Sequence, residues 1–133
     1  MRSAQEQNLL PVVCAFASRN AKVLVALRAP PHRHAGLWEF PGGKIEEGER
    51  PEEALARELW EEIRVRAQVG EHIATGRDEF VKIDCYEVHF EENPIAVEHA
   101  MLAWVEVDEL NRLPMPPADS EIVAAVLRIY EGA

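Results

Sequence analysis

The stretch from residue 43 to residue 65, GKIEEGERPEEALARELWEEIRV, constrains the fold of this chain more than any other part. Leu55, Leu59 and Ile63 recur at every fourth position, which is typical of the buried stripe of an amphipathic helix. Pro51 suits the first position of that helix, because the N–H that proline lacks would have no partner there. The sequence therefore predicts a helix that begins near Pro51 and packs one face against a core.

The side of the same helix that is expected to face solvent carries three carboxylates. Glu58, Glu61 and Glu62 stand at relative positions 0, 3 and 4, which share one helix face with Cβ atoms about 5–6 Å apart. Like charges one turn apart destabilise a helix by roughly 0.2–0.5 kcal/mol, and a bound hard divalent cation removes that cost. On these residues alone two interpretations stay open: a site for Mg²⁺ or Mn²⁺, or a solvated acidic face in a Glu-rich chain.

A glycine-containing segment stands before the helix. Phe40-Pro41-Gly42-Gly43-Lys44 places a proline and two glycines between an apolar segment and the helix start. Glycine lets the backbone approach a ligand closely or adopt a positive φ. We therefore expect a glycine loop, an acidic linker and the amphipathic helix, in that order, with a metal site that spans loop and helix.

These residues resemble the signature of the Nudix hydrolases, in which glycine, five residues, glutamate and seven residues precede Arg-Glu-apolar-any-Glu-Glu-any-Gly-apolar. The matching positions are Gly43, Glu49, Arg57, Glu58, Leu59, Glu61, Glu62 and Val65. Arg64 stands where the family has glycine. That glycine ends the helix in a left-handed conformation, which costs another residue roughly 1 kcal/mol or more. The departure therefore concerns the helix exit and not the metal site.

The rest of the chain predicts strands around this helix and a second helix near the C-terminus. Strands are expected at 9–17, 22–27, 68–79, 82–90 and 101–107, with a hairpin formed by the first two; 108–111 is a helical turn, 113–118 a proline-rich loop and 120–130 a packing helix. Strands interspersed with two helices imply an α/β fold whose sheet is covered on both faces. The resemblance implies an α/β/α sandwich around a mixed sheet, with residues 1–133 forming one domain.

Composition limits the partners of the chain. A net charge of −10 and a pI near 4.9 argue against binding of duplex nucleic acid, which requires a basic surface. Cys14 and Cys85 lie in apolar segments, so we expect buried free thiols and no disulfide. The sequence shows neither an apolar signal core at its N-terminus nor a run of about 18 apolar residues, so we expect a cytoplasmic protein without a membrane partner. A monomer and a homodimer both stay open.

The similarity extends beyond the signature. Trp104 and the segment Leu113-Pro114-Met115-Pro116-Pro117-Ala118-Asp119 look like the C-terminal half of the mutator-type branch of the family. That resemblance implies hydrolysis of (deoxy)nucleoside triphosphates to monophosphate and pyrophosphate, which clears damaged or surplus nucleotides. Oxidised nucleotides such as 8-oxo-dGTP and cytosine nucleotides are the expected substrates. An acidic chain can bind them, because metal ions and local basic residues face the phosphates.

The resemblance also implies roles for individual residues. The expected metal ligands are Glu58, Glu61 and Glu62, the backbone carbonyl of Gly43 and one acidic residue outside the signature. Glu98 is the candidate for that last ligand, because it follows an irregular stretch and precedes the strand that bears Trp104. Glu58, Glu61 and Glu98 are the expected catalytic residues, with Glu58 the first candidate for the general base and Glu98 the second. In the family the residues at Glu49 and Arg57 pair and brace the loop against the helix.

Three residues are candidates for substrate contacts. Arg28 ends the second expected strand, where it can meet phosphate, and Phe40 either stacks on a base or packs in the core. Asp119 is either the cap of the last helix or, as the resemblance implies, the residue that reads the edge of the base. An ionised aspartate only accepts hydrogen bonds, so it suits an amino group or an N–H. His32 and His34 are expected to be solvated.

Two other functions remain open at this point. The same chemistry would serve a nucleoside diphosphate-sugar or dinucleotide hydrolase, although the short chain, without an obvious further recognition domain, favours triphosphates. A catalytically silent nucleotide-binding module of the same fold is the alternative from a different class. The intact set of Glu58, Glu61 and Glu62 argues against it, because binding alone does not need every ligand.

Overall fold

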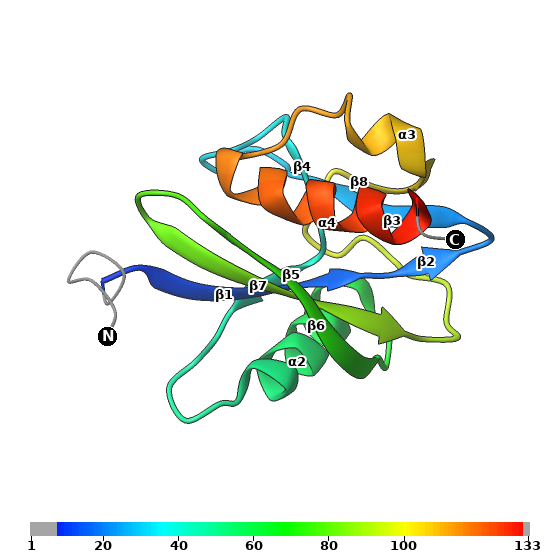
Figure 1. Cartoon of the computed structure of the whole chain (residues 1–133). Coiled ribbons are helices and arrows are strands. Elements are labelled where there is room, and N and C mark those ends of the chain that lie inside the picture. The colour runs from blue at the N-terminus through cyan, green and yellow to red at the C-terminus, as the bar shows by residue number, and fades with distance from the viewer. Residues whose placement is uncertain (1–7, 132–133) are drawn as a thin grey trace.

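Two four-stranded sheets form the body of the protein in a computed structural model that describes residues 8–131 (Figure 1). The first sheet has the order β5-β1-β7-β6, with β1 (Leu10–Phe16), β5 (Gly42–Lys44), β6 (Gln68–Arg77) and β7 (Val81–His89). It is mixed, because β1 runs parallel to β7 and antiparallel to β5. The second sheet centres on β3 (Lys22–Leu27), whose antiparallel partners are β2 (Ser18–Arg19), β4 (Trp38–Glu39) and β8 (Met101–Glu106).

Helices cover opposite faces of the first sheet (Figure 1). On one face lies α2 (Pro51–Ile63), and on the other α4 (Ser120–Glu131), preceded by the 3₁₀ turn η1 (Pro117–Asp119); the short α3 (Val107–Leu110) follows β8. The mixed sheet between helices that the sequence predicts is therefore confirmed. In the part of the chain that the structure describes, no helix has the length and apolar character needed to cross a membrane.

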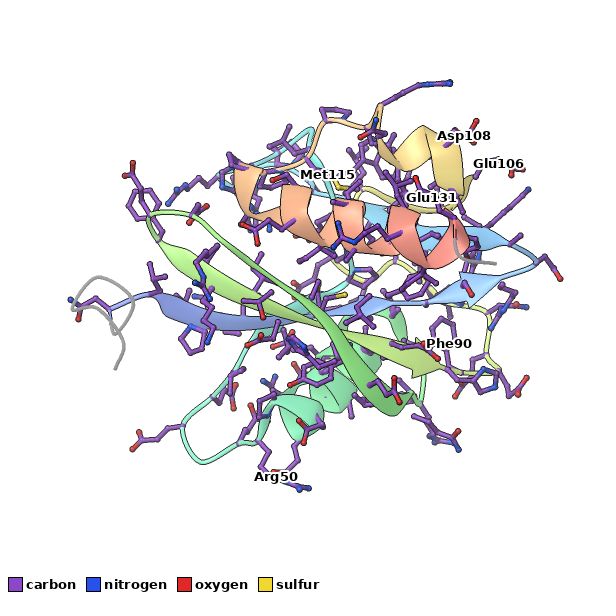
Figure 2. The ribbon with its side chains drawn as sticks, in the orientation of Figure 1. Arg50, Phe90, Glu106, Asp108, Met115 and Glu131 are labelled. Atoms are coloured by element: carbon purple, nitrogen blue, oxygen red, sulfur yellow. The ribbon has the colours of Figure 1, made fainter. Side chains whose placement is uncertain are left out.

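Each helix packs a separate core on the sheet. The stripe of α2 formed by Leu55, Leu59 and Ile63 is fully buried, as its spacing predicts. On the other face, α4 buries Ile122 and Val126 in a second cluster. Polar side chains point outward at the helix start, where Arg50 projects away from the sheet (Figure 2). Sequence periodicity thus determines which face of each helix meets the sheet.

The glycine segment is not the loop that we expected from the sequence. Gly42 and Gly43 lie in β5, which pairs with β1 in the register Val13 to Gly43 and Cys14 to Gly42. A Cβ on Gly42 would overlap the backbone carbonyl oxygen of Val13. Glycine is therefore needed here for the close approach of two strands, and not for an unusual φ.

The expected hairpin between the first two strands is only partly correct. The strand β3 pairs with the short β2, whereas β1 pairs with β5 and β7 in the other sheet. Asn20 and Ala21 make the turn with φ of 54° and 62°. Two successive residues of positive φ form a tight turn that matches the twist of a hairpin. The turn therefore joins β2 to β3, while β1 belongs to the other sheet.

The two cysteines are buried and free, as the sequence predicts. Cys14 in β1 stands opposite Cys85 in β7 across the parallel pair, and both lie in the core on the side of α4. Burial, together with the neighbouring Cys85 thiol, raises the pKa of Cys14. Both thiols therefore act as apolar packing groups.

The helix α2 ends at Arg64, which has φ 58° and ψ 41°. We expect Arg64→Gly to raise the free energy of unfolding by roughly 1 kcal/mol, because glycine adopts this left-handed conformation without a Cβ penalty. The Arg64 guanidinium also lies 5.6 Å from the Trp60 ring, and that contact is lost in the variant. Urea unfolding of wild type, Arg64→Gly and Arg64→Ala measures both effects, since alanine loses the contact but keeps the strained backbone. A glycine variant no more stable than the alanine variant would contradict the prediction.

Candidate functional site

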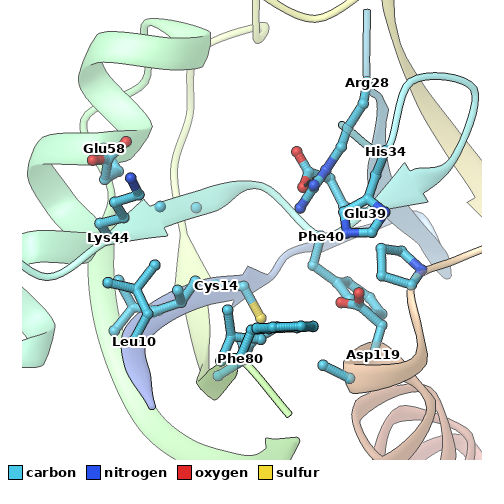
Figure 3. A pocket seen from close by; sticks show the side chains of 18 of the residues that line it. Leu10, Cys14, Arg28, His34, Glu39, Phe40, Lys44, Glu58, Phe80 and Asp119 are labelled. Carbon is cyan, nitrogen blue, oxygen red and sulfur yellow. Dashed lines mark hydrogen bonds and ion pairs between the residues drawn. The ribbon is translucent and has the colours of Figure 1, made fainter. Parts of the chain in front are cut away.

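The strands β1 and β5, the second half of α2 and the turn η1 border a cavity of about 600 Å³, the main cavity (Figure 3). Gly43, Lys44 and Glu58 line one side of it, and Phe40 and Asp119 line another. A side cavity of about 360 Å³ adjoins it and is lined by Glu62, Glu98, His99 and the loop after β3. Arg28, His32, Glu39 and Glu62 border both cavities. The two cavities adjoin at these shared residues, and carboxyl groups lie at both ends of the main cavity, Glu58 and Glu62 at one and Asp119 at the other.

The junction of β5 and α2 brings a glycine against a carboxylate. A Cβ on Gly43 would overlap the carboxylate of Glu58. Only glycine at this position lets the strand lie so close to the middle of the helix while the Glu58 side chain stays over it. The backbone of Gly43 and the side chain of Glu58 therefore face the same part of the main cavity.

Arg57 connects the acidic linker to the helix. Its Nε and Nη2 donate to the two carboxylate oxygens of Glu49 at 2.8 and 3.0 Å, and Nη2 also donates to the Lys44 carbonyl at 3.0 Å. Its Nη1 donates to Glu58 at 2.9 Å and to Glu61 at 3.1 Å. The hydrogen bonds from Arg57 lower the pKa of Glu49. The ion pair expected between Glu49 and Arg57 is therefore present, and it fixes both ends of the linker.

Burial shifts the protonation of the carboxylates that face the cavities. It raises the pKa of Glu58, although Arg57 opposes the shift. Burial raises the pKa of Glu62 to about 8, and the charges of Glu58, Glu39 and Glu98 add to it. The Oε2 atom of Glu62 is buried without a hydrogen-bond partner in the described residues. A buried oxygen without a partner, surrounded by further carboxylates, favours binding of a hard cation.

The loop before β8 carries Glu98 to the end of α2. The N–H of Ile95 donates to the Ile63 carbonyl at 2.9 Å, and the N–H of Val97 donates to the Glu62 carbonyl at 3.1 Å. These bonds satisfy carbonyls that a helix end leaves without partners. They also place Glu98 at the side cavity together with Glu62.

The structure does not bring all the predicted ligands together. The side chain of Glu61 is 54% exposed and contacts Arg57, and it lines neither cavity. Within residues 8–131, no three His, Cys, Asp or Glu side chains already stand close enough to hold a metal ion. Glu58, Glu62 and Glu98 border the cavities without forming a closed cluster, and Arg57 binds Glu58 from one side.

Arg28 and Phe40 both line the main cavity (Figure 3). Arg28 lies on the side of the cavity opposite Glu58, and its Nε is paired with Oε1 of Glu39. Phe40 is 3% exposed and belongs to the core cluster on the side of α4, so it packs in the core and also lines the cavity. The two interpretations of Phe40 from the sequence therefore do not exclude one another.

Asp119 is the buried charged residue at the other end of the main cavity. It is 3% exposed, and its carboxyl group lies near Phe40 (Figure 3). It is the last residue of η1, and the backbone continues from it directly into α4. Burial raises the pKa of Asp119 to about 7, and the charge of Glu39 adds to the shift. An acid with this pKa is present in both protonation states near neutral pH.

Sequence reasoning missed several cavity residues. Lys44 follows the signature glycine directly, so its place beside Glu58 could have been inferred. Glu39 and His99 each adjoin a predicted site residue, but no periodic pattern marks them. Phe80 lies at the tip of the β6–β7 turn, where it is 57% exposed, and the Arg33 guanidinium lies 4.8 Å from its ring. Contacts between distant loops like this one leave no signal in local spacing.

Comparison with known proteins agrees with this geometry. Residues 8–126 match the family model described as NUDIX domain. The chain is 36% identical over 126 residues to the CTP pyrophosphohydrolase of Escherichia coli strain K12, covering 91% of this chain and 93% of that protein. It is 32% identical over 125 residues to the 8-oxo-dGTP diphosphatase of the same strain, covering 84% and 91%.

A solved structure matches the fold. The solution structure of the Escherichia coli ORF135 protein has a TM-score of 0.81 and 35% identity, covering 94% of this chain and 93% of that chain. The family model extends over far more than the signature, and both relatives align along most of their length. The chain therefore belongs to the Nudix family and is a hydrolase of that family.

Proposed function

We propose that this protein is a divalent-metal-dependent pyrophosphohydrolase of (deoxy)nucleoside triphosphates that releases a monophosphate and pyrophosphate. The observation that carries the proposal is the main cavity, which has Glu58 and Glu62 at one end and Phe40 and buried Asp119 at the other. Such a cavity suits a ligand with a phosphate chain and a base. The names of the similar proteins, a CTP pyrophosphohydrolase and an 8-oxo-dGTP diphosphatase, support the same substrate class.

In this proposal, Mg²⁺ or Mn²⁺ would be held by the carboxylates of Glu58, Glu62 and Glu98 and by the Gly43 carbonyl, and Glu61 would join them once its side chain turns from Arg57 into the cavity. The orphaned Oε2 of Glu62 and the contact between Gly43 and Glu58 fit such a group. When bound, the metal supplies charge neutralisation on the phosphates and a lower pKa for water. Arg57, paired with Glu49, holds the linker that positions this end of the site.

The protein's own residues supply orientation and proton transfer. Glu58 takes the proton of the attacking water, with Glu98 as the second candidate, and burial makes Glu58 a stronger base by raising its pKa. Arg28, between the two cavities, offers N–H groups to the phosphate chain. The positive charge of Arg28 and the charge of the bound metal would offset the repulsion between an acidic protein and its anionic substrate.

Phe40 and Asp119 select the base in this proposal. The Phe40 ring stacks on the base, and Asp119 reads its edge. As a carboxylate, Asp119 accepts from an amino group such as that of cytosine; as a neutral acid it also donates to a carbonyl. Because the pKa of Asp119 is about 7, both forms are available near neutral pH. Such an acid would let one pocket accept both cytosine and oxidised guanine.

We also propose that one domain carries the whole activity and that it acts on the nucleotide pool of the cytoplasm, a compartment that suits two adjacent unpaired thiols. The removal of damaged nucleotides before they enter DNA would then make it part of DNA repair in the wide sense.

Chromatography of the products formed from a substrate panel, which separates monophosphates, pyrophosphate and sugar phosphates, tests the function. The panel holds CTP, dCTP, dGTP and 8-oxo-dGTP, with a nucleoside diphosphate sugar and a dinucleotide as the alternative substrates, each with and without Mg²⁺. We expect metal-dependent release of pyrophosphate from the triphosphates. Faster cleavage of the diphosphate sugar or the dinucleotide would replace this function by the alternative. Tight nucleotide binding without any cleavage would indicate a binding module.

A matched pair of glycine substitutions tests the geometry of the site. We expect Gly42→Ala to lower the free energy of unfolding by about 1–3 kcal/mol, because the new Cβ meets the Val13 backbone, which cannot move aside. We expect Gly43→Ala to change stability far less, because the Glu58 side chain can rotate away, but to lower kcat strongly. Urea unfolding and steady-state kinetics on both variants measure this separation. An active Gly43→Ala enzyme would show that the position of Glu58 over β5 is not required.

A further inference from the structure

Glu39 in β4 is held from two sides, by Arg28 and by His99. Its Oε1 pairs with Nε of Arg28, and its Oε2 lies 2.9 Å from Nε2 of His99. The side chains of Arg28, Glu39 and His99 are 20%, 15% and 7% exposed. The three residues come from the end of β3, from β4 and from the loop before β8, which meet at the same end of the second sheet. They form a chain of contacts that leads from a buried imidazole to the cavities.

The unpartnered nitrogen of His99 indicates which way the hydrogen bond runs. Nδ1 is buried and has no hydrogen-bond partner in the described residues. The tautomer with its hydrogen on Nε2 leaves only a lone pair unpaired at Nδ1, whereas the other tautomer would bury an N–H without an acceptor. His99 therefore donates from Nε2 to Glu39. This bond occupies Oε2 and leaves Oε1 for Arg28.

Arg28 borders both cavities. Its hydrogen bond to Glu39 determines which of the Arg28 N–H groups remain free. With Oε2 held by His99, Glu39 engages Arg28 through Nε. The terminal nitrogens then remain for other partners; Nη1 lies 3.4 Å from Nδ1 of His32, at the border of both cavities. Without His99, the Glu39 carboxylate can turn to accept a second, parallel bond from a terminal nitrogen, the geometry that carboxylates and guanidinium groups prefer.

We propose that His99 is a positioning residue that, through Glu39, keeps the terminal N–H groups of Arg28 directed at the phosphate chain of the substrate. The inference rests on the proposed function, since it assumes that Arg28 binds phosphate. His99 itself touches no reacting atom. Its effect should therefore appear in substrate affinity and depend on the presence of Arg28.

Two substitutions of His99 by amide residues of different side-chain length test its positioning role. His99→Gln keeps a donor near the position of Nε2, whereas the shorter His99→Asn ends before Glu39. The probe is the α,β-methylene analogue of CTP with Mg²⁺, and its Kd is measured by calorimetry. We expect the Asn variant to bind about tenfold more weakly, the Gln variant to bind nearly as wild type, and KM to rise more than kcat falls. Equal weakening by both variants, or none, would overturn the proposal.

A double-mutant cycle with Arg28→Ala shows whether His99 acts through Arg28. We expect His99→Asn to cause no further loss of affinity once Arg28 is alanine, because the group that it positions is absent. Additive losses would overturn the proposal. The control is His89→Asn: His89 pairs with Glu91 on the surface, with side chains 67% and 89% exposed, and its substitution should leave Kd unchanged. Melting temperatures verify folding, and His99→Leu replaces the Asn variant if that one does not fold.

Side-chain NMR of the free protein tests the contact without any substrate. In wild type and His99→Gln, we expect the Arg28 Nε–H to be protected from exchange while its terminal N–H groups rotate freely. In His99→Asn, a terminal N–H should become protected as Glu39 takes a second bond. Identical spectra in both variants would overturn the positioning role. If wild type neither cleaves nor binds any triphosphate, the proposed function fails, and this NMR result still decides whether His99 orients Arg28.

Discussion

Replacement of Glu62 by glutamine lowers the rate of pyrophosphate release at saturating Mg²⁺ by about a thousandfold, which corresponds to several kcal/mol of lost metal-mediated stabilisation. Glutamine keeps the volume of the side chain but removes a charge whose Oε2 has no other partner in the described residues. The measurement is kcat across a Mg²⁺ titration. Glu121→Gln, on the exposed face of α4, is the control and should behave as wild type. Activity of Glu62→Gln within about twofold of wild type would remove this residue from the metal site.

Stability provides a second measurement on the same variant. Added Mg²⁺ should raise the melting temperature of wild type more than that of Glu62→Gln, because a ligand stabilises the state that binds it. Without metal, the pKa of Glu62, about 8, lies above its value in an unfolded chain. The folded protein then binds more protons than the unfolded chain between about pH 4 and pH 8, so stability falls as the pH rises through this window. Glu62→Gln should reduce that fall by up to about 1.4 kcal/mol per pH unit.

Asp119→Asn changes the choice of base. At about pH 8, where Asp119 is mostly ionised, the variant replaces one acceptor oxygen with a donor. We expect kcat/KM for cytosine triphosphates to fall by an amount equivalent to about 1–3 kcal/mol, because the amino group loses its acceptor. A base that presents a carbonyl should gain. 8-Oxo-guanine offers both a carbonyl and an N–H, so a gain at one group opposes a loss at the other.

The pH profile separates a base-reading role from a structural one. In wild type, kcat/KM for cytosine triphosphates relative to that for 8-oxo-dGTP should rise as the pH increases through about 7, and in Asp119→Asn this ratio should stay constant. Asp108→Asn, on the exposed surface of α3, is the matched control (Figure 2). A uniform change of kcat/KM for every base would show that Asp119 affects only packing.

The sequence predicts the helix side of the site well. Leu55, Leu59 and Ile63 repeat with the helical period, so the neighbouring face with its carboxylates follows from the spacing. The left-handed exit at Arg64 follows from a single comparison with the family pattern. These features are local, and local spacing determines them.

Other parts of the site depend on contacts between distant segments. The strand β5 was expected as a loop, because two glycines resemble a flexible segment until the neighbouring β1 shows why side chains are excluded. Glu61 shares a helix face with Glu58, yet Arg57 holds it outside both cavities. Glu39 and His99 pair across 60 positions of sequence, which no local pattern predicts.

The hydrogen bonds from Ile95 and Val97 to the last carbonyls of α2 couple local unfolding to loss of the site. A helix end normally frays more easily than its middle, and here the fraying turn holds Glu62 while the released loop holds Glu98. One opening event therefore separates two of the proposed metal ligands. The amide hydrogens of Ile95 and Val97 should exchange with solvent together, and a bound cation should slow both. The exchange rate of these two amides would report the fraction of time that the enzyme lacks a complete metal site.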